Sequence, residues 1–343
     1  MATVLEPVRI GILGAARVAP DAVVTPARAT GSRLTAIAAR DTGRARRFAA
    51  DHGVERVLPG YAEVVADESV DLVYNPLPNS LHTPWNLAAI SAGKHVLSEK
   101  PFSANAAEAA AVRDAGECAG VVVADGFHYR YHPVTLRLLE LVTRGELGDV
   151  LDVTAIVVIP RPPAGDLRLS VDLAGGALMD GGCYALHAVS LVSAALDGTA
   201  TLRGAGGREF PDLPGVDERV EALFELPGGA EGHAVCWMAG DRTELSLTVT
   251  GTRATARAEN FILPHIDDRL TVTWPGGERV ERLGRRSSYT YQLQAVLRAI
   301  RYGTPLPTDS SDAVATMGLV DAVYRAASLP PRRSSPVRHV TDR

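Results

Sequence analysis

Short, β-branched apolar runs alternate with longer segments rich in alanine and charge over the first part of the chain. The runs are VRIGIL, RLTAIAA, VDLVYNP, KHVLS and VVVAD, and the segments between them are long enough for helical crossovers. Strands that are apolar on both faces are typical of a parallel sheet covered by helices on both sides. The pattern therefore predicts an α/β domain over residues 1–127 with a doubly wound parallel sheet.

A different pattern begins at residue 128. A helical segment that ends at a glycine is followed by the strand-like run VLDVTAIVVIP, a helical segment over about 176–195, and several alternating strands without helices between them. Such a succession predicts a large, mostly antiparallel sheet, with hairpins at two PGG turns. Two helical segments complete this α+β domain of residues 128–328. Residues 329–343, rich in Pro, Arg and Ser, are expected to form a disordered tail.

Composition and charge narrow the classes of partner. The 343 residues are 46% hydrophobic and 22% charged, enough for two domains. A net charge of -5 argues against a nucleic-acid or anionic-membrane partner. Three widely spaced cysteines, Cys118, Cys183 and Cys236, argue against a disulfide framework or a metal site. With no signal-peptide pattern and no long apolar run, we expect a cytoplasmic protein.

The first strand ends in a turn of small residues, GILGAARVA, that leads into a helix. In a dinucleotide site such a turn brings backbone N–H groups close to the pyrophosphate. Only the first glycine of the usual GxGxxG pattern is present, so a simple tight strand-to-helix turn is the alternative. If the turn binds a cofactor, its contacts come from Gly14, Ala15, Ala16, Arg17 and Val18.

The end of the second strand indicates which dinucleotide is bound. NAD-specific folds usually have an Asp or Glu here for the ribose hydroxyls, and this chain has Ala39 followed by Arg40. An arginine binds the 2′-phosphate of NADP(H), which a carboxylate repels. NADP is favoured, and NAD remains possible because Asp41 either caps the next helix, leaving Arg40 in solvent, or faces the ribose itself.

The segment GKHVLSEKP places Lys100 at the carboxyl end of a strand, just before a proline. The carboxyl ends of strands in open α/β sheets face the ligand crevice. Lys100 is therefore either an ammonium group at the mouth of a cofactor cleft or part of a solvated surface turn.

These motifs, together with NPLPNSLH, FHYRYHP, GGALMDGGCYALH and TDSSDAVATMGLVDAVYRAA, resemble the Gfo/Idh/MocA oxidoreductases from residue 8 to about 327. The resemblance is strongest to the branch of NADP-dependent D-xylose dehydrogenases and dimeric dihydrodiol dehydrogenases. It implies a Rossmann domain that binds NADP, with Glu99 near the nicotinamide ribose and Lys100 on the reacting hydroxyl. It also implies an open-faced C-terminal sheet that often mediates oligomers, and cofactor contacts from Pro76, Leu77, Asn79 and His82.

The segment GGALMDGGCYALH supplies the second half of the predicted site. If it is helical, Asp180, Tyr184 and His187 project from one face. A tyrosine beside a lysine can give a proton to an alkoxide; the alternative is an interior helix whose polar groups bond to the backbone. Many family members have His at the position of Tyr184 and Asp at that of His187, whereas the branch above uses Tyr. Tyr184 is thus the expected proton carrier, Asp180 a further catalytic candidate, and His187 has no settled role.

The expected substrate is a sugar or a related polyhydroxylated ring. Its site is expected to be lined by His128 and Arg130, with Tyr131 nearby. Gly126-Phe127 departs from relatives that often have an acidic residue and an alanine, which alters the floor of the substrate site. One alternative is a ketoreductase of a nucleotide-linked keto-sugar, with the diphosphate contacted by arginines among Arg161, Arg168, Arg285 and Arg286. Another is a non-catalytic sugar sensor, against which the retained Lys100 and Tyr184 argue.

Assembly is predicted from the strands between residues 219 and 274. They leave a sheet face with Ala, Leu, Val, Phe and Trp side chains that few helices can cover. Exposed apolar area of that size marks an interface. We therefore expect a homo-oligomer, a dimer or a tetramer.

Overall fold

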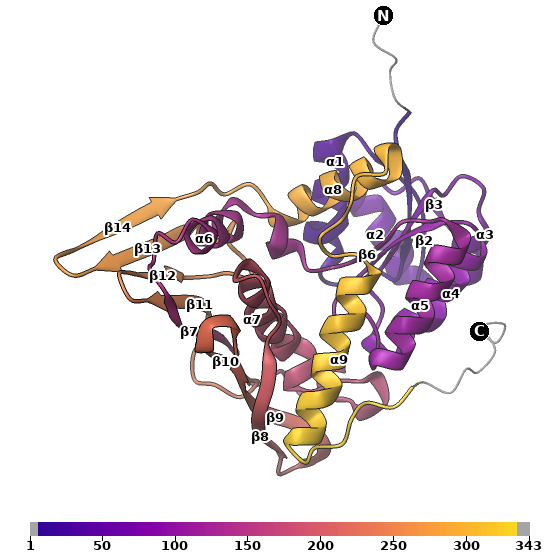
Figure 1. Ribbon diagram of the computed structural model, residues 1–343. Helices are drawn as coiled ribbons and strands as arrows, with labels where there is room; N and C mark the ends of the chain where they lie inside the picture. Colours follow the sequence, from indigo (N-terminus) through magenta and orange to yellow (C-terminus); the bar gives the residue numbers. More distant parts are fainter. Residues whose placement is uncertain (1–5, 335–343) are drawn as a thin grey trace, which may run out of the picture. The chain divides into compact units, whose positions relative to one another are not determined.

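A computed structural model describes residues 6–334, which form two compact units. The first unit contains residues 6–127 and Tyr289–Val314, and the second contains His128–Ser288 and Ala315–Arg333. The sequence analysis assigned residues 289–314 to the second domain, and the structure corrects this. Helix α8 (Ser288–Tyr302) lies beside α1 (Thr25–Thr30) in Figure 1, and it buries Tyr289, Leu293 and Val296 in the core of the first unit.

The first unit is built on a six-stranded parallel sheet. Its strands, in spatial order, are β3 (Arg56–Val57), β2 (Arg33–Ala38), β1 (Arg9–Leu13), β4 (Leu72–Asn75), β5 (His95–Ser98) and β6 (Val123–Asp125). The order reverses at β1, as in Rossmann folds, and confirms the predicted doubly wound sheet. The remaining helices are η1 (Pro20–Val24), α2 (Thr42–His52), α3 (Tyr61–Ala66), η2 (Asn79–Leu81), α4 (His82–Ser91) and α5 (Ala106–Ala119).

The second unit contains an eight-stranded sheet. In spatial order its strands are β14 (Gly277–Arg282), β13 (Arg269–Trp274), β12 (Thr255–Ala258), β11 (Glu244–Gly251), β7 (Val150–Val158), β10 (Glu231–Trp237), β9 (Leu213–Glu225) and β8 (Thr201–Phe210). All neighbours are antiparallel except β7 and β10. Both PGG turns close hairpins, β9–β10 and β13–β14, as predicted.

Helices of the second unit pack on one face of this sheet. Those with the most strand contacts are α6 (Pro133–Thr143), η6 (Leu178–Gly182) and α7 (Cys183–Ala195). The unit also contains the short helical turns η3 (His128–Tyr131), η4 (Leu167–Leu169), η5 (Val171–Leu173) and, between β9 and β10, η7 (Pro227–Gly229). Helix α9 (Ser310–Ala326) has its first turn in the first unit and its remainder in the second. Helix α7 packs mainly on β7 and β10. The buried side chains of β9 and β10 lie in the same core.

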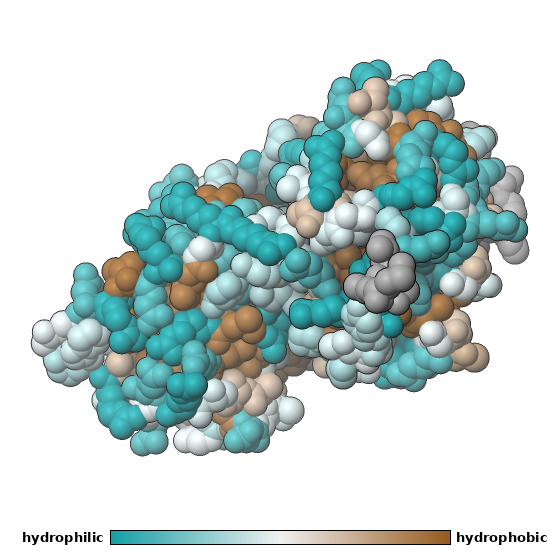
Figure 2. Space-filling model, turned by 90° about the horizontal axis from the view of Figure 1, so that it is seen from above, coloured by the Kyte–Doolittle hydropathy of each residue, from teal (hydrophilic) through white to brown (hydrophobic). Residues whose placement is uncertain are grey.

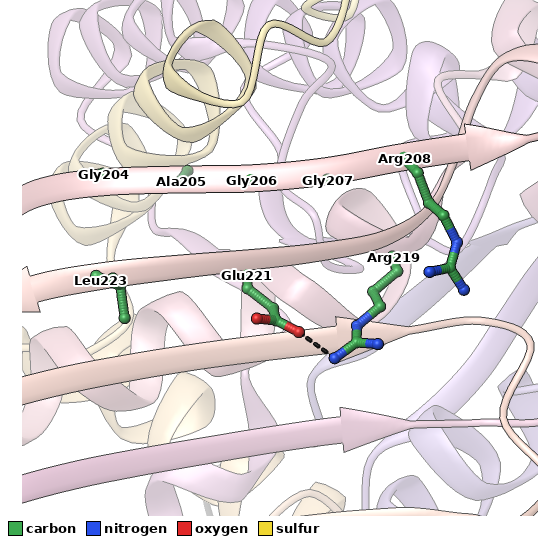
Figure 3. A pocket seen from close by; sticks show the side chains of 8 residues that line it. All are labelled: Gly204, Ala205, Gly206, Gly207, Arg208, Arg219, Glu221 and Leu223. Atoms are coloured by element: carbon green, nitrogen blue, oxygen red, sulfur yellow. Dashed lines mark hydrogen bonds and ion pairs between the residues drawn. The ribbon is translucent and has the colours of Figure 1, made fainter.

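The opposite face of the sheet differs from the apolar surface predicted for it. Phe224 and Ala222 are buried on the helix-covered side, because side chains alternate along β9. The outer face instead carries Arg219, ion-paired to Glu221, and Leu223, which is 49% exposed. Figure 3 shows a shallow pocket here, lined by Gly204, Ala205, Gly206, Gly207, Arg208, Arg219, Glu221 and Leu223.

Part of the predicted disordered tail is ordered. Leu329 and Arg332 are buried in the second unit. Residues 335–343 of that tail lie outside the described residues.

No helix within residues 6–334 combines the length and the apolar character needed to cross a bilayer. On the face seen in Figure 2, hydrophobic residues form small patches separated by hydrophilic ones.

Candidate active site

The turn after β1 is shaped for close approach of a ligand to the backbone. Gly14 has φ +92°, which favours glycine, and its N–H donates to the carbonyl of Ala38 at 2.7 Å. A Cβ on Gly14 would come within 3.2 Å of the Leu77 side chain. The carbonyl of Ala15 accepts a hydrogen bond from Nη2 of Arg44 at 2.8 Å, a contact that the sequence analysis missed. Ala16 and Val18 are half-buried in this turn, and Arg17 is exposed.

Exposed arginine side chains lie near the end of β2, and the carboxylate of Asp41 there is hydrogen-bonded to the backbone. Arg40 is exposed and Ala39 half-buried. Asp41 is the N-cap of α2 and accepts a hydrogen bond from the backbone N–H of Arg44 at 3.0 Å, which lowers the pKa of Asp41. The capping role favours the reading in which Asp41 does not face a ribose, and it leaves the side chains of Arg40 and Arg44 at this strand end.

The turn after β4 is held by a chain of buried amides. Nδ2 of Asn75 donates to Oδ1 of Asn86 at 2.7 Å, and Nδ2 of Asn86 donates to the Ser98 hydroxyl at 3.0 Å. Oδ1 of Asn75 also accepts the backbone N–H of Leu77 at 3.3 Å. These contacts join the ends of β4 and β5, and the sequence analysis did not identify them. Leu77 is buried in this turn, and Pro76 and Asn79 are half-buried.

The His82 side chain lies between the carbonyl groups of two backbone turns. Its ring is buried, with Nδ1 at 2.8 Å from the carbonyl oxygen of Pro101 and Nε2 at 2.7 Å from that of Leu77. Burial, assisted by the charge of Lys100, lowers the pKa of His82 to about 4, so the ring is neutral. Both ring nitrogens therefore face backbone carbonyls, and a contact of His82 with the cofactor stays a prediction.

Lys100 lies at the end of β5 among buried carboxyl groups. Oε1 of Glu99 accepts a hydrogen bond from the Tyr74 hydroxyl at 2.9 Å, and burial raises the pKa of Glu99. Burial also raises the pKa of Asp125 well above its ordinary value, with a further contribution from the carboxylate of Asp312. The Lys100 ammonium opposes both shifts, so it is the local source of positive charge.

Gly126 explains how the end of β6 fits against this turn. A Cβ on Gly126 would come within 2.9 Å of the Ser98 carbonyl oxygen, 3.0 Å of the Glu99 Cα and 3.0 Å of the Lys100 nitrogen. All three are backbone atoms, which cannot move without shifting the turn. Glycine at residue 126 therefore permits close contact with the Lys100 backbone, whose bond to Pro101 is cis.

The second unit gathers buried hydroxyl and imidazole groups around Tyr184. The Tyr184 hydroxyl lies 3.2 Å from Nε2 of His128, and the Tyr129 hydroxyl lies 2.6 Å from Nδ1 of His187. The Tyr129 and Tyr184 rings are 5.8 Å apart between centroids. All four side chains are buried. The structure thus brings together three predicted residues, and it adds Tyr129.

Asp180 precedes Tyr184 in the same helical segment and pairs with an arginine. The segment begins as a π-helical turn, η6, before it becomes α-helical at Cys183. Oδ2 of Asp180 lies 3.6 Å from Nη1 of Arg168, which also pairs with Asp166. The predicted helical face is therefore divided between an ion pair at Asp180 and the hydroxyl–imidazole group at Tyr184. Arg130 is half-buried in η3.

A buried ion pair supports the start of this helical segment. Arg332 pairs with Asp217, and Nε of Arg332 donates to the carbonyl of Gly175 at 2.7 Å. The second oxygen of Asp217 accepts the backbone N–H of Leu178 at 2.6 Å. The C-terminal segment thus helps to fix the entry to η6 and α7.

The first unit fits a dinucleotide. It offers a glycine turn after the first strand, small side chains beside it and exposed arginines near the end of the neighbouring strand. Residues that would hold the cofactor are Gly14, Ala15, Ala16, Arg17, Val18, Ala39, Arg40, Pro76, Leu77, Asn79, Glu99 and Lys100. The second unit offers an acid–base group at Tyr184. Across residues 6–334, no cluster of three His, Cys, Asp or Glu side chains could hold a metal ion.

Comparison with known proteins agrees with this arrangement. Residues 8–127 match the oxidoreductase family model with an NAD-binding Rossmann fold, GFO_IDH_MocA, and residues 135–257 match a GFO/IDH/MocA C-terminal domain. The chain is 36% identical to D-xylose 1-dehydrogenase (NADP(+)) 2 of Haloferax volcanii, covering 92% of this chain and 96% of that protein.

One further relative is named for a nucleotide sugar, and one solved structure contains a TDP compound. The chain is 34% identical to dTDP-3,4-didehydro-2,6-dideoxy-alpha-D-glucose 3-reductase of Streptomyces violaceoruber, covering 94% of this chain and 96% of that one. The 3-ketoreductase KijD10 of Actinomadura kijaniata, solved with NADP and TDP-benzene, has a TM-score of 0.87 at 27% identity and covers 94% and 98% of the two chains. Fold, motifs and relatives agree, and the chain belongs to the Gfo/Idh/MocA family of oxidoreductases.

Proposed function

We propose that this protein is an NADP(H)-dependent oxidoreductase of a sugar or a related polyhydroxylated ring, in which Lys100 orients the reacting oxygen and Tyr184 is the general acid and base. The observation that carries the proposal is the Tyr184 hydroxyl within 3.2 Å of His128 Nε2 in a buried polar group. A phenol placed in this way can exchange its proton with a reacting oxygen and recover it from the imidazole. The nicotinamide of the bound cofactor supplies or accepts the hydride at the substrate carbon.

The preference for NADP(H) over NAD(H) rests on the end of β2. No carboxylate follows Ala38 until Asp41, and Asp41 is engaged as a helix cap. The exposed guanidinium of Arg40 is suited to a bidentate contact with a 2′-phosphate. The relatives named above as an NADP(+) dehydrogenase and as an NADP complex support the same choice.

The roles of Lys100 and Tyr184 have a parallel in the 3-ketoreductase. That protein has been solved with a lysine replaced by alanine and with a tyrosine replaced by phenylalanine. Those two positions are separated by the same number of residues as Lys100 and Tyr184. The parallel supports the proposed pair.

A second candidate substrate is a nucleotide-linked keto-sugar, which two of the reported relatives favour. Three of the four arginines considered for its diphosphate have carboxylate partners: Arg161 pairs with Asp212, Arg168 with Asp166 and Asp180, and Arg285 with Asp268. A diphosphate would have to compete with these carboxylates. The simple sugar therefore stays the first choice.

A spectrophotometric screen at about 340 nm tests the proposal, since only the reduced cofactor absorbs there. It measures NADP⁺ reduction with aldoses, cyclitols and dihydrodiols, and NADPH oxidation with dTDP-linked keto-sugars. Turnover of an aldose or cyclitol supports the first choice, and turnover of the keto-sugar alone supports the second. No turnover in either direction with either class contradicts the proposed function.

We also propose that the protein is a dimer or a tetramer joined through the outer face of the eight-stranded sheet. Exposed Leu223 and the neighbouring glycines of β8 line the shallow pocket of this face, beside the Arg219–Glu221 ion pair (Figure 3). An interface with apolar and charged contacts side by side is common in such assemblies. Light scattering at micromolar concentration tests this: Leu223→Glu is expected to shift the mass toward the monomer, and a monomeric wild-type protein contradicts it.

A further inference from the structure

A chain of hydrogen bonds leads away from the Tyr184 hydroxyl. Nε2 of His128 lies 3.2 Å from that hydroxyl, and Nδ1 of His128 lies 2.8 Å from Oγ of Ser288. The same Oγ lies 3.1 Å from Nδ1 of His265. Tyr184, His128 and Ser288 are buried, His265 is half-buried, and its neighbour Ile266 is 58% exposed. The chain therefore runs from the interior of the second unit to its surface.

We propose that His128, Ser288 and His265 form a proton relay that connects Tyr184 with solvent. The relay rests on the proposed role of Tyr184 as the general acid and base. A buried phenol that exchanges a proton with the substrate needs a route by which that proton is replaced, and the relay supplies such a route. None of the three relay residues needs to touch the substrate.

One set of neutral tautomers satisfies every contact in the chain. Nδ1–H of His265 donates to Oγ of Ser288, and the Ser288 hydroxyl donates to Nδ1 of His128. Nε2–H of His128 then donates to the Tyr184 oxygen. Each hydrogen points toward Tyr184, so the phenolic hydrogen can point away from the relay, toward a reacting oxygen. No charged imidazole is required in the resting state.

The proton balance is complete when a carbonyl is reduced. The substrate oxygen takes the phenolic proton of Tyr184. The O–H bond of Tyr184 breaks, and an O–H bond forms on the substrate. The phenolate takes the Nε2 proton of His128, whose Nδ1 takes the hydroxyl proton of Ser288. Ser288 takes the Nδ1 proton of His265, and His265 takes one proton from water. One proton enters from solvent for each turnover, and in alcohol oxidation every transfer runs in reverse.

Other titratable groups lie against the relay and must be considered in its test. Tyr129 and His187 pack beside Tyr184 from η3 and α7. His132, before α6, interacts electrostatically with His265 and with Asp268. Burial, with a smaller contribution from His265 and against the charge of Asp268, lowers the pKa of His132 to about 4, so His132 is neutral near pH 7.

The first test needs no substrate. In the full-length protein labelled with ¹⁵N-histidine, ring nitrogen shifts are followed by NMR from pH 5 to 8, with His128→Gln and His265→Gln used for assignment. Protonation of His265 is expected to shift the His128 nitrogens in the wild type. Ser288→Ala is expected to remove this coupling. Ser193→Ala, which removes a buried serine on α7 that bonds to the Gly198 carbonyl, should leave it intact.

The second test follows turnover of the sugar or keto-sugar accepted in the screen above. Ser288→Ala and His265→Ala are expected to slow proton exchange with a pH indicator roughly tenfold or more, since acid–base assistance commonly contributes about 10² to 10⁴. Added imidazole is expected to restore His265→Ala but not Ser288→Ala. Ser193→Ala again serves as the control for loss of a buried hydroxyl.

The two proposals fail in different ways. If Tyr184→Phe turns over substrate at the wild-type rate, the proposed function of Tyr184 is overturned. If Tyr184→Phe turns over slowly but the His128 nitrogen shifts of the wild type do not respond to protonation of His265, the relay is overturned. The relay is also overturned if Ser288→Ala exchanges protons at the wild-type rate. A folded Ser288→Ala protein without the nitrogen coupling and with slow proton exchange supports the relay.

Discussion

Gly126 and Lys100 are in such close contact that a Cβ on Gly126 would lie 3.0 Å from the Lys100 backbone nitrogen. The two residues come from the ends of neighbouring parallel strands, β6 and β5. The absence of a side chain at residue 126 therefore determines where the Lys100 turn lies. This relationship suggests that the reactivity of the site depends on a residue that carries no functional group.

Gly126→Ala is expected to displace the Lys100 turn and to lower kcat/KM. Misplacement of a reacting group by about 1 Å can cost about 10² in rate. The matched control is Gly318→Ala on α9, where a Cβ has no neighbour within 4 Å. Steady-state kinetics with the accepted substrate checks the prediction. Equal kcat/KM for Gly126→Ala and the control would show that the turn accommodates the methyl group.

Arg40→Ala is expected to weaken NADP(H) binding about tenfold to a hundredfold and to leave NAD(H) binding nearly unchanged. Hydrogen bonds to charged groups contribute roughly 1.5–3 kcal/mol, and only NADP(H) carries the 2′-phosphate. Arg46→Ala is the control. Arg46 is an exposed arginine of α2, and it lies on a different side of this helix from Arg44, the other arginine near the end of β2.

Calorimetric titration of both cofactors measures these affinities. Tighter binding of NAD(H) than NADP(H) by the wild type would overturn the cofactor preference. Unchanged NADP(H) affinity in Arg40→Ala, with preference retained, would move the phosphate contact to another cation such as Arg44.

His82 is expected to make stability depend on pH below neutrality. Its pKa is about 4 in the folded protein and about 6.5 when the chain is unfolded, so protons bind the unfolded chain more readily between these values. The stabilisation is complete above pH 6.5 and is lost as pH falls toward 4, a difference of about 3 kcal/mol.

Urea unfolding at several pH values compares the wild type with His82→Gln. The variant is less stable near pH 7 because two turns lose their link, but its free energy of unfolding should fall less steeply between pH 6.5 and 4. Parallel curves for the two proteins would mean that His82 takes up protons equally well when folded.

The sequence predicted strands well where side chains alternate or are uniformly apolar, and it missed strands that lack such a pattern. Gly204, Gly206 and Gly207 remove the alternation from β8, so no strand was predicted there. In the sheet only Gly207 of these three is in close contact: its Cβ would lie 2.8 Å from the Arg219 carbonyl oxygen, whereas a Cβ on Gly204 or Gly206 would have no neighbour within 4 Å. The two-residue strand β3 is too short to leave a pattern.

Helix α8 shows that the sequence predicts a helix more readily than the place where the helix packs. Its helical periodicity is visible in the sequence, but an amphipathic stripe does not specify which sheet it covers. The structure places Leu293 and Val296 in the core of the first unit. The burial of Arg332 was hidden for a similar reason, because a Pro/Arg-rich composition does not reveal a distant carboxylate such as Asp217.

The candidate site was predicted in part. Lys100, Glu99 and Tyr184 follow from strand ends and motifs, which are local. The contact of His128 with Ser288 joins residues 160 positions apart, and no local pattern predicts it. The run FHYRYHP did contain a signal, since several polar aromatic side chains beside a predicted strand end need hydrogen-bond partners if they are buried.

The central claim is that Lys100 and Tyr184 act together on the reacting oxygen. The most direct measurement is the rate of hydride transfer in stopped-flow single turnovers, with saturating NADP(H), for the wild type, Lys100→Met, Tyr184→Phe and the double variant. Both single variants should bind the cofactor nearly normally and react about 10² to 10⁴ times more slowly, and the double variant should be little worse than the slower single one. A wild-type rate in Tyr184→Phe, together with a large loss in Asp180→Asn or His187→Ala, would contradict the claim and assign the proton to another residue of that helical segment.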